Sequence, residues 1–325
     1  MRRLIAVLLL LTLFSGGVSC KRAQEKTEPA KEGIKVLTTF LPIYIFSMNV
    51  AEGVPGVSVD VLIPPEFAGP HGYEPTPSDM RKVAEADVLI ANGLGLETFL
   101  DSIGAVNPDL WIAFASRGID TLPDVPPERM RGAKKRGDQA TAEHHEKHRH
   151  NHGPVNPHVW VSPFLAARQV RNIADTLAVL DKANADKYRR NADAYAGKLE
   201  ALGEEYKKMS ASVKKRKIVT IHNSFDYLAR DIGIEVVAVL RVDPMSEPRA
   251  GELARMADLI RAEDVAAIFT EPQFPVRLAE VLAKETGAPI FQLDPVAIGK
   301  PDAGLYEIIM RKNLDTLKKA LEGKK

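Results

Sequence analysis

Three histidines and one aspartate stand where the chain holds a side chain in few orientations. His71 lies in the segment 69–79, whose three prolines and two glycines restrict the loop. His158 follows Pro157, while His222 and Asp294 directly follow apolar runs that end at residues 221 and 293. Neutral imidazole nitrogen and carboxylate oxygen bind zinc at about 2.0–2.2 Å in tetrahedral geometry. A lone histidine is more often a surface or hydrogen-bonded residue, so only the four residues as a set indicate a metal site.

The elements that must position these residues alternate along the chain. From Ile34 onward, short apolar runs alternate with amphipathic segments, which predicts an α/β fold of two lobes, each a parallel sheet flanked by helices. Ligands of open parallel sheets lie beyond the carboxyl ends of the strands. His71 and His158 belong to the first lobe, and His222 and Asp294 belong to the second. A site that uses all four therefore lies in the cleft between the lobes.

One long helix is predicted between the lobes, over about residues 183–210. Its apolar residues alternate spacings of four and three, namely Tyr188, Ala192, Tyr195, Leu199, Leu202, Tyr206 and Met209. Such a helix is about 40 Å long. The alternative is a coiled-coil helix that packs on another chain. We expect an N-terminal lobe at 34–181, a rigid linking helix at 182–212 and a C-terminal lobe at 213–325.

The first residues have the order of a secretory signal, which we expect to occupy residues 1–19. Two arginines precede the apolar run 4–14, and small residues lead to Cys20. This position resembles a bacterial lipoprotein cleavage site, although Gly17 stands where an aliphatic residue is usual; an unmodified cysteine is the alternative. Residues 20–33 then form a polar tether after a lipidated Cys20. Because Cys20 is the only cysteine, an intramolecular disulfide and a zinc-thiolate cluster are excluded.

A histidine-rich tract lies within residues 123–154, which hold few large apolar side chains and are expected to form a mobile surface loop. Its five histidines are His144, His145, His148, His150 and His152. Such tracts bind metal by composition, so we expect this one to gather zinc weakly near the cleft. The alternative is a solvated polar loop whose deletion leaves tight binding intact.

The segments 70–79, 156–160, 222–227 and 293–295 together resemble the zinc/manganese solute-binding proteins of ABC transporters, also called cluster 9 metal-binding receptors. The resemblance implies that His71, His158, His222 and Asp294 are the four metal ligands. It also implies a zinc-type member, because such members often carry a histidine-rich loop here. Members that carry manganese tend to have glutamate in place of His222, and imidazole favours Zn²⁺. Mn²⁺ remains the alternative cargo.

The function implied by the resemblance is capture of Zn²⁺ and its delivery to an ABC permease and its ATPase. We expect a monomer held by its lipid anchor in the periplasm or on the outer face of the cell membrane. Four protein ligands close the site, whereas catalytic zinc keeps a position open for water, so we expect no enzyme activity. A metallohydrolase and a surface adhesin or storage protein are the alternatives. The net charge of +1 gives no argument for nucleic acid as a partner.

Two smaller expectations concern neighbours of these residues. Ser78 is expected to cap a helix that runs to Glu85. Glu271, which follows the apolar run 268–270, is expected either to accept a hydrogen bond from a ligating imidazole or to be a surface or helix-capping residue.

Overall fold

The computed structural model describes residues 33–67, 70–124, 155–240 and 250–322, and residues 33–325 form one compact unit. The predicted signal, Cys20, residues 20–32 of the tether and the five histidines of the tract lie outside the described residues. Across the part that is described, no helix is both long enough and apolar enough to span a membrane.

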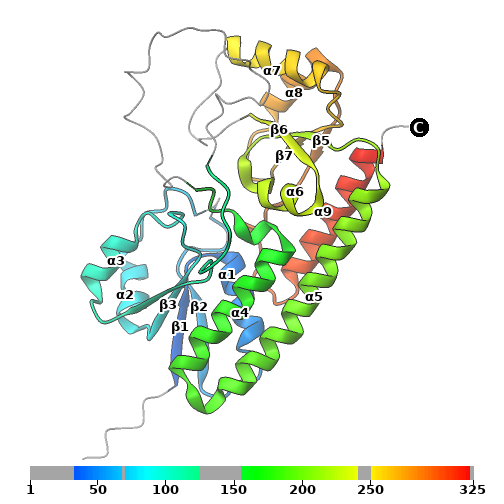
Figure 1. Ribbon diagram of the computed structural model, residues 1–325. Coiled ribbons are helices and arrows are strands. Elements are labelled where there is room, and N and C mark those ends of the chain that lie inside the picture. Colours follow the sequence, from blue (N-terminus) through cyan, green and yellow to red (C-terminus); the bar gives the residue numbers. More distant parts are fainter. Residues whose placement is uncertain (1–32, 68–69, 125–154, 241–249, 323–325) are drawn as a thin grey trace, which may run out of the picture. The chain divides into compact units, whose positions relative to one another are not determined.

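The first lobe is built on a four-stranded parallel sheet in the order β2-β1-β3-β4 (Figure 1). Its strands are β1 (Ile34–Thr38), β2 (Val57–Val61), β3 (Val88–Ala91) and β4 (Trp111–Phe114). The helices between them are α1 (Leu41–Val50), α2 (Pro77–Glu85) and α3 (Leu100–Val106). All four residues of β3 are buried, as expected for a central parallel strand covered on both faces.

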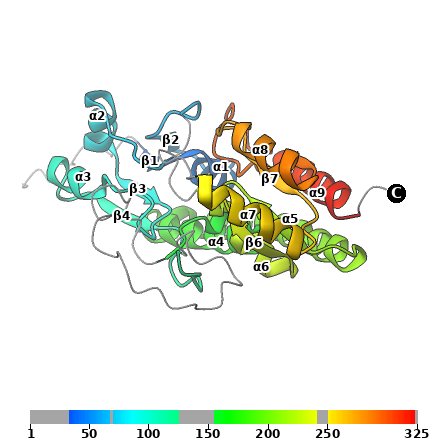
Figure 2. The ribbon, with the colours of Figure 1, turned by 90° about the horizontal axis from the view of Figure 1, so that it is seen from above.

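The second lobe repeats this plan with the sheet order β6-β5-β7-β8, again all parallel. Its strands are β5 (Lys217–Thr220), β6 (Glu235–Val239), β7 (Ile268–Thr270) and β8 (Ile290–Gln292). Its helices are α6 (Asp226–Ile232), α7 (Ala250–Ala262) and α8 (Arg277–Thr286). Figure 2 shows α8 and α6 on opposite sides of this sheet. The predicted two-lobed α/β fold is confirmed.

Three longer helices and three short 3₁₀ turns complete the described fold. The helices are α4 (Pro163–Leu180), α5 (Ala185–Ser212) and α9 (Leu305–Glu322), and the turns are η1 (Val159–Val161), η2 (Lys182–Asn184) and η3 (Asn223–Phe225). Helix α5 is the predicted linking helix. All seven apolar residues of its predicted stripe are buried, and the helix packs on α4 and α9 of the same chain. The stripe is therefore covered within the chain, which leaves no seam for the coiled-coil alternative.

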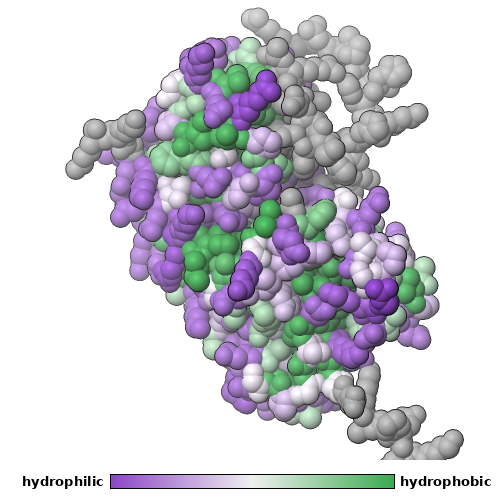
Figure 3. Space-filling model, turned by 180° about the vertical axis from the view of Figure 1, so that it is seen from behind, coloured by the Kyte–Doolittle hydropathy of each residue, from purple (hydrophilic) through white to green (hydrophobic). Residues whose placement is uncertain are grey.

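Helix α9 contacts both lobes, although it follows the last strand of the second. It lies beside α5 (Figure 1) and also packs against α1 of the first lobe. The rings of Tyr306 in α9 and Phe46 in α1 are 5.1 Å apart between centroids. One apolar core accordingly runs through both lobes, and a smaller one lies between the second sheet and helices α7 and α8. On the face seen in Figure 3, polar and apolar residues are interspersed.

Close packing of α4 on α5 depends on Gly203. A β-carbon at this position would lie 2.6 Å from the ring of Phe164 in α4. We expect Gly203→Ala to lower the free energy of unfolding by about 1–3 kcal/mol, because the ring or a helix must shift to admit the methyl group. Denaturant unfolding of the purified variant measures the change.

The matched control is Gly197→Ala in the same helix, where a β-carbon meets no atom within 4 Å. Glycine inside a helix costs about 1 kcal/mol relative to alanine, so this variant should be slightly more stable than the wild type. Equal stability of the two alanine variants would contradict the packing described for Gly203.

Candidate metal centre

Within the described residues, His71, His158 and His222 meet at the junction of the two lobes, with one ligand nitrogen of each within 4.8 Å of the others. The Nε2 atoms of His71 and His158 are 2.9 Å apart. The ring centroid of His222 lies 4.7 Å from that of His158 and 5.4 Å from that of His71. Nitrogen ligands of one tetrahedral zinc ion are separated by about 3.3 Å. The three rings are therefore compact enough to share one ion.

The loop that carries His71 is braced by the start of helix α2. The Asp79 carboxylate accepts hydrogen bonds from Tyr73 Oη at 2.8 Å, Thr76 N at 2.8 Å and Thr76 Oγ1 at 2.7 Å. Thr76 is the N-cap of α2, and Thr76 and Asp79 form a capping box. The expectation that Ser78 caps this helix is wrong, because Pro77 already occupies the first helical position.

Electrostatics agree with this role of Asp79. Burial by itself raises the pKa of Asp79, but the hydrogen bonds from Thr76 and Tyr73 outweigh burial and lower the pKa below its usual value. The ionised carboxylate is thus the form that the fold stabilises. The charged Asp79 carboxylate, which accepts three hydrogen bonds, therefore holds Tyr73 and Thr76 just beyond His71.

His158 is oriented by Asn156, two residues earlier. The Oδ1 atom of Asn156 lies 2.7 Å from His158 Nδ1 and 2.9 Å from the backbone nitrogen of His158. An amide oxygen accepts only, so Nδ1 of His158 carries the proton and donates it. The lone pair is then on Nε2, which faces His71. This tautomer is the one that a metal at the junction requires.

His222 follows β5 and is buried, with two polar neighbours at Nδ1. Ser224 Oγ lies at 2.5 Å and Glu271 Oε1 at 3.7 Å. Glu271 is 1% exposed, which excludes the surface role. Burial raises the pKa of Glu271 to about 8, opposed by hydrogen bonds from Ser224 and Gln273 and assisted by the charge of Asp294. A cation bound at the histidines would lower that pKa again.

Asp294 lies in the same neighbourhood but not within the three-histidine group. Its Oδ1 accepts a hydrogen bond from Val296 N at 2.8 Å. Burial raises the pKa of Asp294, against the Val296 N–H and the charge of Lys312. Ligand atoms of one tetrahedral zinc ion are about 3.3 Å apart, and Asp294 is not in the group whose ligand atoms lie within 4.8 Å of one another. To coordinate with all three histidines, the Asp294 side chain must move closer than it stands.

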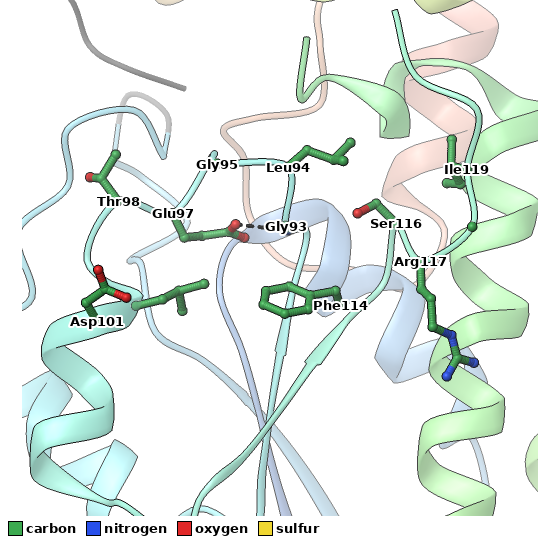
Figure 4. Close-up of a pocket in the computed structure, with 12 residues that line it drawn as sticks. Gly93, Leu94, Gly95, Glu97, Thr98, Asp101, Phe114, Ser116, Arg117 and Ile119 are labelled. Atoms are coloured by element: carbon green, nitrogen blue, oxygen red, sulfur yellow. Dashed lines mark hydrogen bonds between the residues drawn. The ribbon is translucent and has the colours of Figure 1, made fainter. Parts of the chain in front are cut away.

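A separate cavity of about 670 Å³ opens beyond β3 and β4, and none of the three histidines lines it (Figure 4). Its wall includes Glu97, which is buried and accepts hydrogen bonds from Asn92 N, Gly93 N and Thr39 Oγ1 at 2.7–3.0 Å. Burial raises the pKa of Glu97, opposed by these bonds. The carboxyl group anchors the loop after β3, and Asn92 of that loop donates to Pro157 O at 3.0 Å. Glu97 therefore fixes the loop whose Asn92 side chain bonds to Pro157, the residue before His158.

Comparison with known proteins identifies the kind of molecule that carries this site. Residues 36–320 match the family model described as zinc-uptake complex component A, periplasmic. The chain belongs to the ZnuA family. The resemblance inferred from the sequence is thereby confirmed, and this family is one of uptake components rather than enzymes.

Individual relatives agree with the family match. The ZnuA protein of a Bacillus subtilis high-affinity zinc uptake system is 31% identical over 316 residues, which cover 93% of each chain. The zinc-binding lipoprotein AdcA of Streptococcus pneumoniae is 29% identical over 89% of this chain, but the match spans only 56% of AdcA. A solved structure of the solute-binding protein FpvC from Pseudomonas aeruginosa with Mn²⁺ has 31% identity and a TM-score of 0.72, covering 89% of this chain and 98% of FpvC.

Beyond the four predicted ligands, the structure adds two residues to the centre. Asn156 and Ser224 each contact the Nδ1 atom of a histidine two positions away. Both stand in segments that carry the family resemblance, but their side-chain contacts depend on the turn of the backbone at each histidine. A polar residue two positions from a candidate ligand is the only sequence signal that could have indicated them.

Proposed function

We propose that this ZnuA-family protein is an extracytoplasmic solute-binding protein that captures Zn²⁺ between its lobes and delivers it to an ABC permease with its ATPase. The observation that carries the proposal is the convergence of three imidazoles from both lobes on one point. His71, His158 and His222 supply nitrogen ligands, and Asp294 supplies the fourth, after its side chain moves towards them.

The donor chemistry favours zinc as the cargo. Three imidazole nitrogens suit Zn²⁺ better than Mn²⁺, which prefers oxygen ligands. The manganese complex of FpvC keeps Mn²⁺ as the alternative. Because ligands come from both lobes, separation of the lobes would break the ligand set and release the ion without chemical change. That arrangement suits delivery rather than turnover.

The N-terminal residues and the relatives together support an extracytoplasmic location. We place the mature protein in the periplasm or on the outer face of the cell membrane, as a monomer anchored by a lipid on Cys20. The family description as periplasmic and the name of the pneumococcal relative as a lipoprotein support this location. Mass spectrometry of membrane-extracted protein tests the anchor on Cys20.

Metal analysis of the purified protein tests the function. We expect one zinc ion for each wild-type chain and none in His71→Ala after the same mild chelator wash, because His158, His222 and Asp294 without His71 hold the ion more weakly. Cells that lack the gene should take up zinc slowly at limiting zinc and recover only with the wild-type gene. Equal zinc in both proteins, or uptake independent of the gene, would refute the proposal.

The histidine-rich tract has a separate expected effect. Deletion of residues 143–152 should slow zinc uptake at limiting zinc while the equilibrium affinity of the purified protein stays within threefold of the wild type. A control with the five histidines replaced by glutamine keeps the length of the segment and should behave like the deletion. Unchanged uptake in both variants would remove the gathering role of the tract.

A further inference from the structure

Asn156 is fully buried, and its side chain makes hydrogen bonds in two directions. Its Oδ1 accepts from the backbone N–H and from Nδ1 of His158, at 2.9 and 2.7 Å. Its Nδ2 donates to the backbone carbonyl of Asn223 at 2.9 Å. One amide therefore contacts a candidate ligand of the first lobe and the residue that follows His222 in the second.

Further contacts between the lobes surround this amide. The hydroxyl of Tyr227 in α6 donates to Asn156 O at 2.6 Å and accepts from Leu122 N at 2.9 Å. The Nδ2 atom of Asn223 donates to Asp124 Oδ1 at 2.8 Å. The second lobe thus holds both the segment before His158 and the segment 122–124 that pairs with it.

The two ends of the Asn156 amide are not interchangeable in this setting. Rotation by 180° would point its NH₂ group at the N–H of His158 and its oxygen at the carbonyl of Asn223, which removes every bond and adds two repulsive contacts. The backbone N–H of His158 and the carbonyl of Asn223 therefore both favour the orientation in which an oxygen faces His158. That oxygen in turn keeps the proton on Nδ1 and the metal-binding lone pair on Nε2.

We propose that Asn156 is a positioning residue that couples the two ligand-bearing loops: its oxygen sets the tautomer of His158, and its NH₂ group ties the orientation of the His158 ring to the second lobe. The inference rests on the proposed function, in which these histidines bind the metal. Groups that orient ligating histidines typically contribute about 10–100-fold in metal affinity. When Asn223 withdraws, the amide loses its contact with that loop's backbone and keeps its bonds to His158, so the orientation of the His158 ring is less restrained.

Three variants test the proposal. Asn156→Ala removes both contacts, and we expect zinc affinity to fall about 10–100-fold. Asn156→Asp keeps an acceptor for His158 but puts an oxygen against the Asn223 carbonyl and near Asp226, so its zinc affinity should also fall. Asn172→Ala is the control, because Asn172 is a buried asparagine that donates to Ala115 O and Arg117 O at 2.7 and 2.8 Å, outside the metal centre. Its affinity should stay within threefold of the wild type.

The readouts are zinc competition titration, thermal unfolding to show that each variant is folded, and ¹⁵N NMR of the His158 ring in metal-free protein. We expect the signature of a protonated Nδ1 in the wild type and in Asn156→Asp, and its loss in Asn156→Ala. A wild-type affinity in either Asn156 variant, or an equal loss in Asn172→Ala, would overturn the coupling. Because the ring signature needs no metal, it decides the role of Asn156 even if the wild type fails to bind zinc, which would instead refute the proposed function.

Discussion

Replacement of His222 by alanine is expected to weaken zinc binding by roughly 10²–10⁴-fold, since proteins hold structural zinc with about 10–16 kcal/mol shared among three or four ligands. His222 is the only nitrogen ligand that the second lobe contributes to the group. Its loss leaves His71 and His158 from the first lobe and only the proposed ligand Asp294 from the second, so the ion links the lobes weakly. Competition with a chelating dye at neutral pH measures the affinity.

The control for His222→Ala is His152→Ala, which removes one of the five histidines of the tract. Because weak, redundant binding there is separate from the tight site, this variant should bind zinc like the wild type. Thermal unfolding of both metal-free variants separates a lost ligand from a lost fold. A folded His222→Ala protein with an affinity within tenfold of the wild type would exclude His222 as a ligand.

Zinc affinity is also expected to fall steeply in mild acid. Imidazole must be neutral to coordinate, and its ordinary pKa is about 6.5. Affinity is therefore fully present above this pKa and is lost as the pH falls through it. Between pH 7.5 and 5.5, each histidine ligand lowers the affinity about tenfold, so three ligands lower it about a thousandfold. Titration against a chelator of known pH dependence measures the loss.

The size of that loss of zinc affinity indicates how many histidines coordinate the ion. In His222→Ala, one proton fewer competes with the metal, and the loss over the same pH range should shrink about tenfold. A flat response in the wild type would contradict coordination by histidine. A loss of affinity of about a hundredfold would indicate that only two histidines coordinate the ion.

Local sequence was sufficient to predict the fold class and to predict that His71, His158 and His222 lie close together. The linking helix was predicted at 183–210 and lies at 185–212 in α5, because seven apolar residues at helical spacing fix one buried face. Strands β5, β7 and β8 lie within the predicted apolar runs, since the strands of a parallel sheet between helices are rich in apolar residues. His222 stands two residues after the end of β5, so its place at the carboxyl edge of the sheet could be predicted from its position in the chain.

What depended on the tertiary structure is the direction of each side chain and the contacts between lobes. Asp294 follows β8 as predicted, yet its carboxylate bonds to Val296 N and stands outside the histidine group. Thr76 rather than Ser78 caps α2, because the side chain of Thr76 accepts from the backbone N–H of Asp79 and the side chain of Asp79 accepts from the backbone N–H of Thr76. Asn156 meets Asn223, 67 positions along the chain, only through the packing of α6 against the first lobe. Strand and helix periodicity reports which face of an element is buried, but it carries no information on which distant backbone groups come to face a side chain.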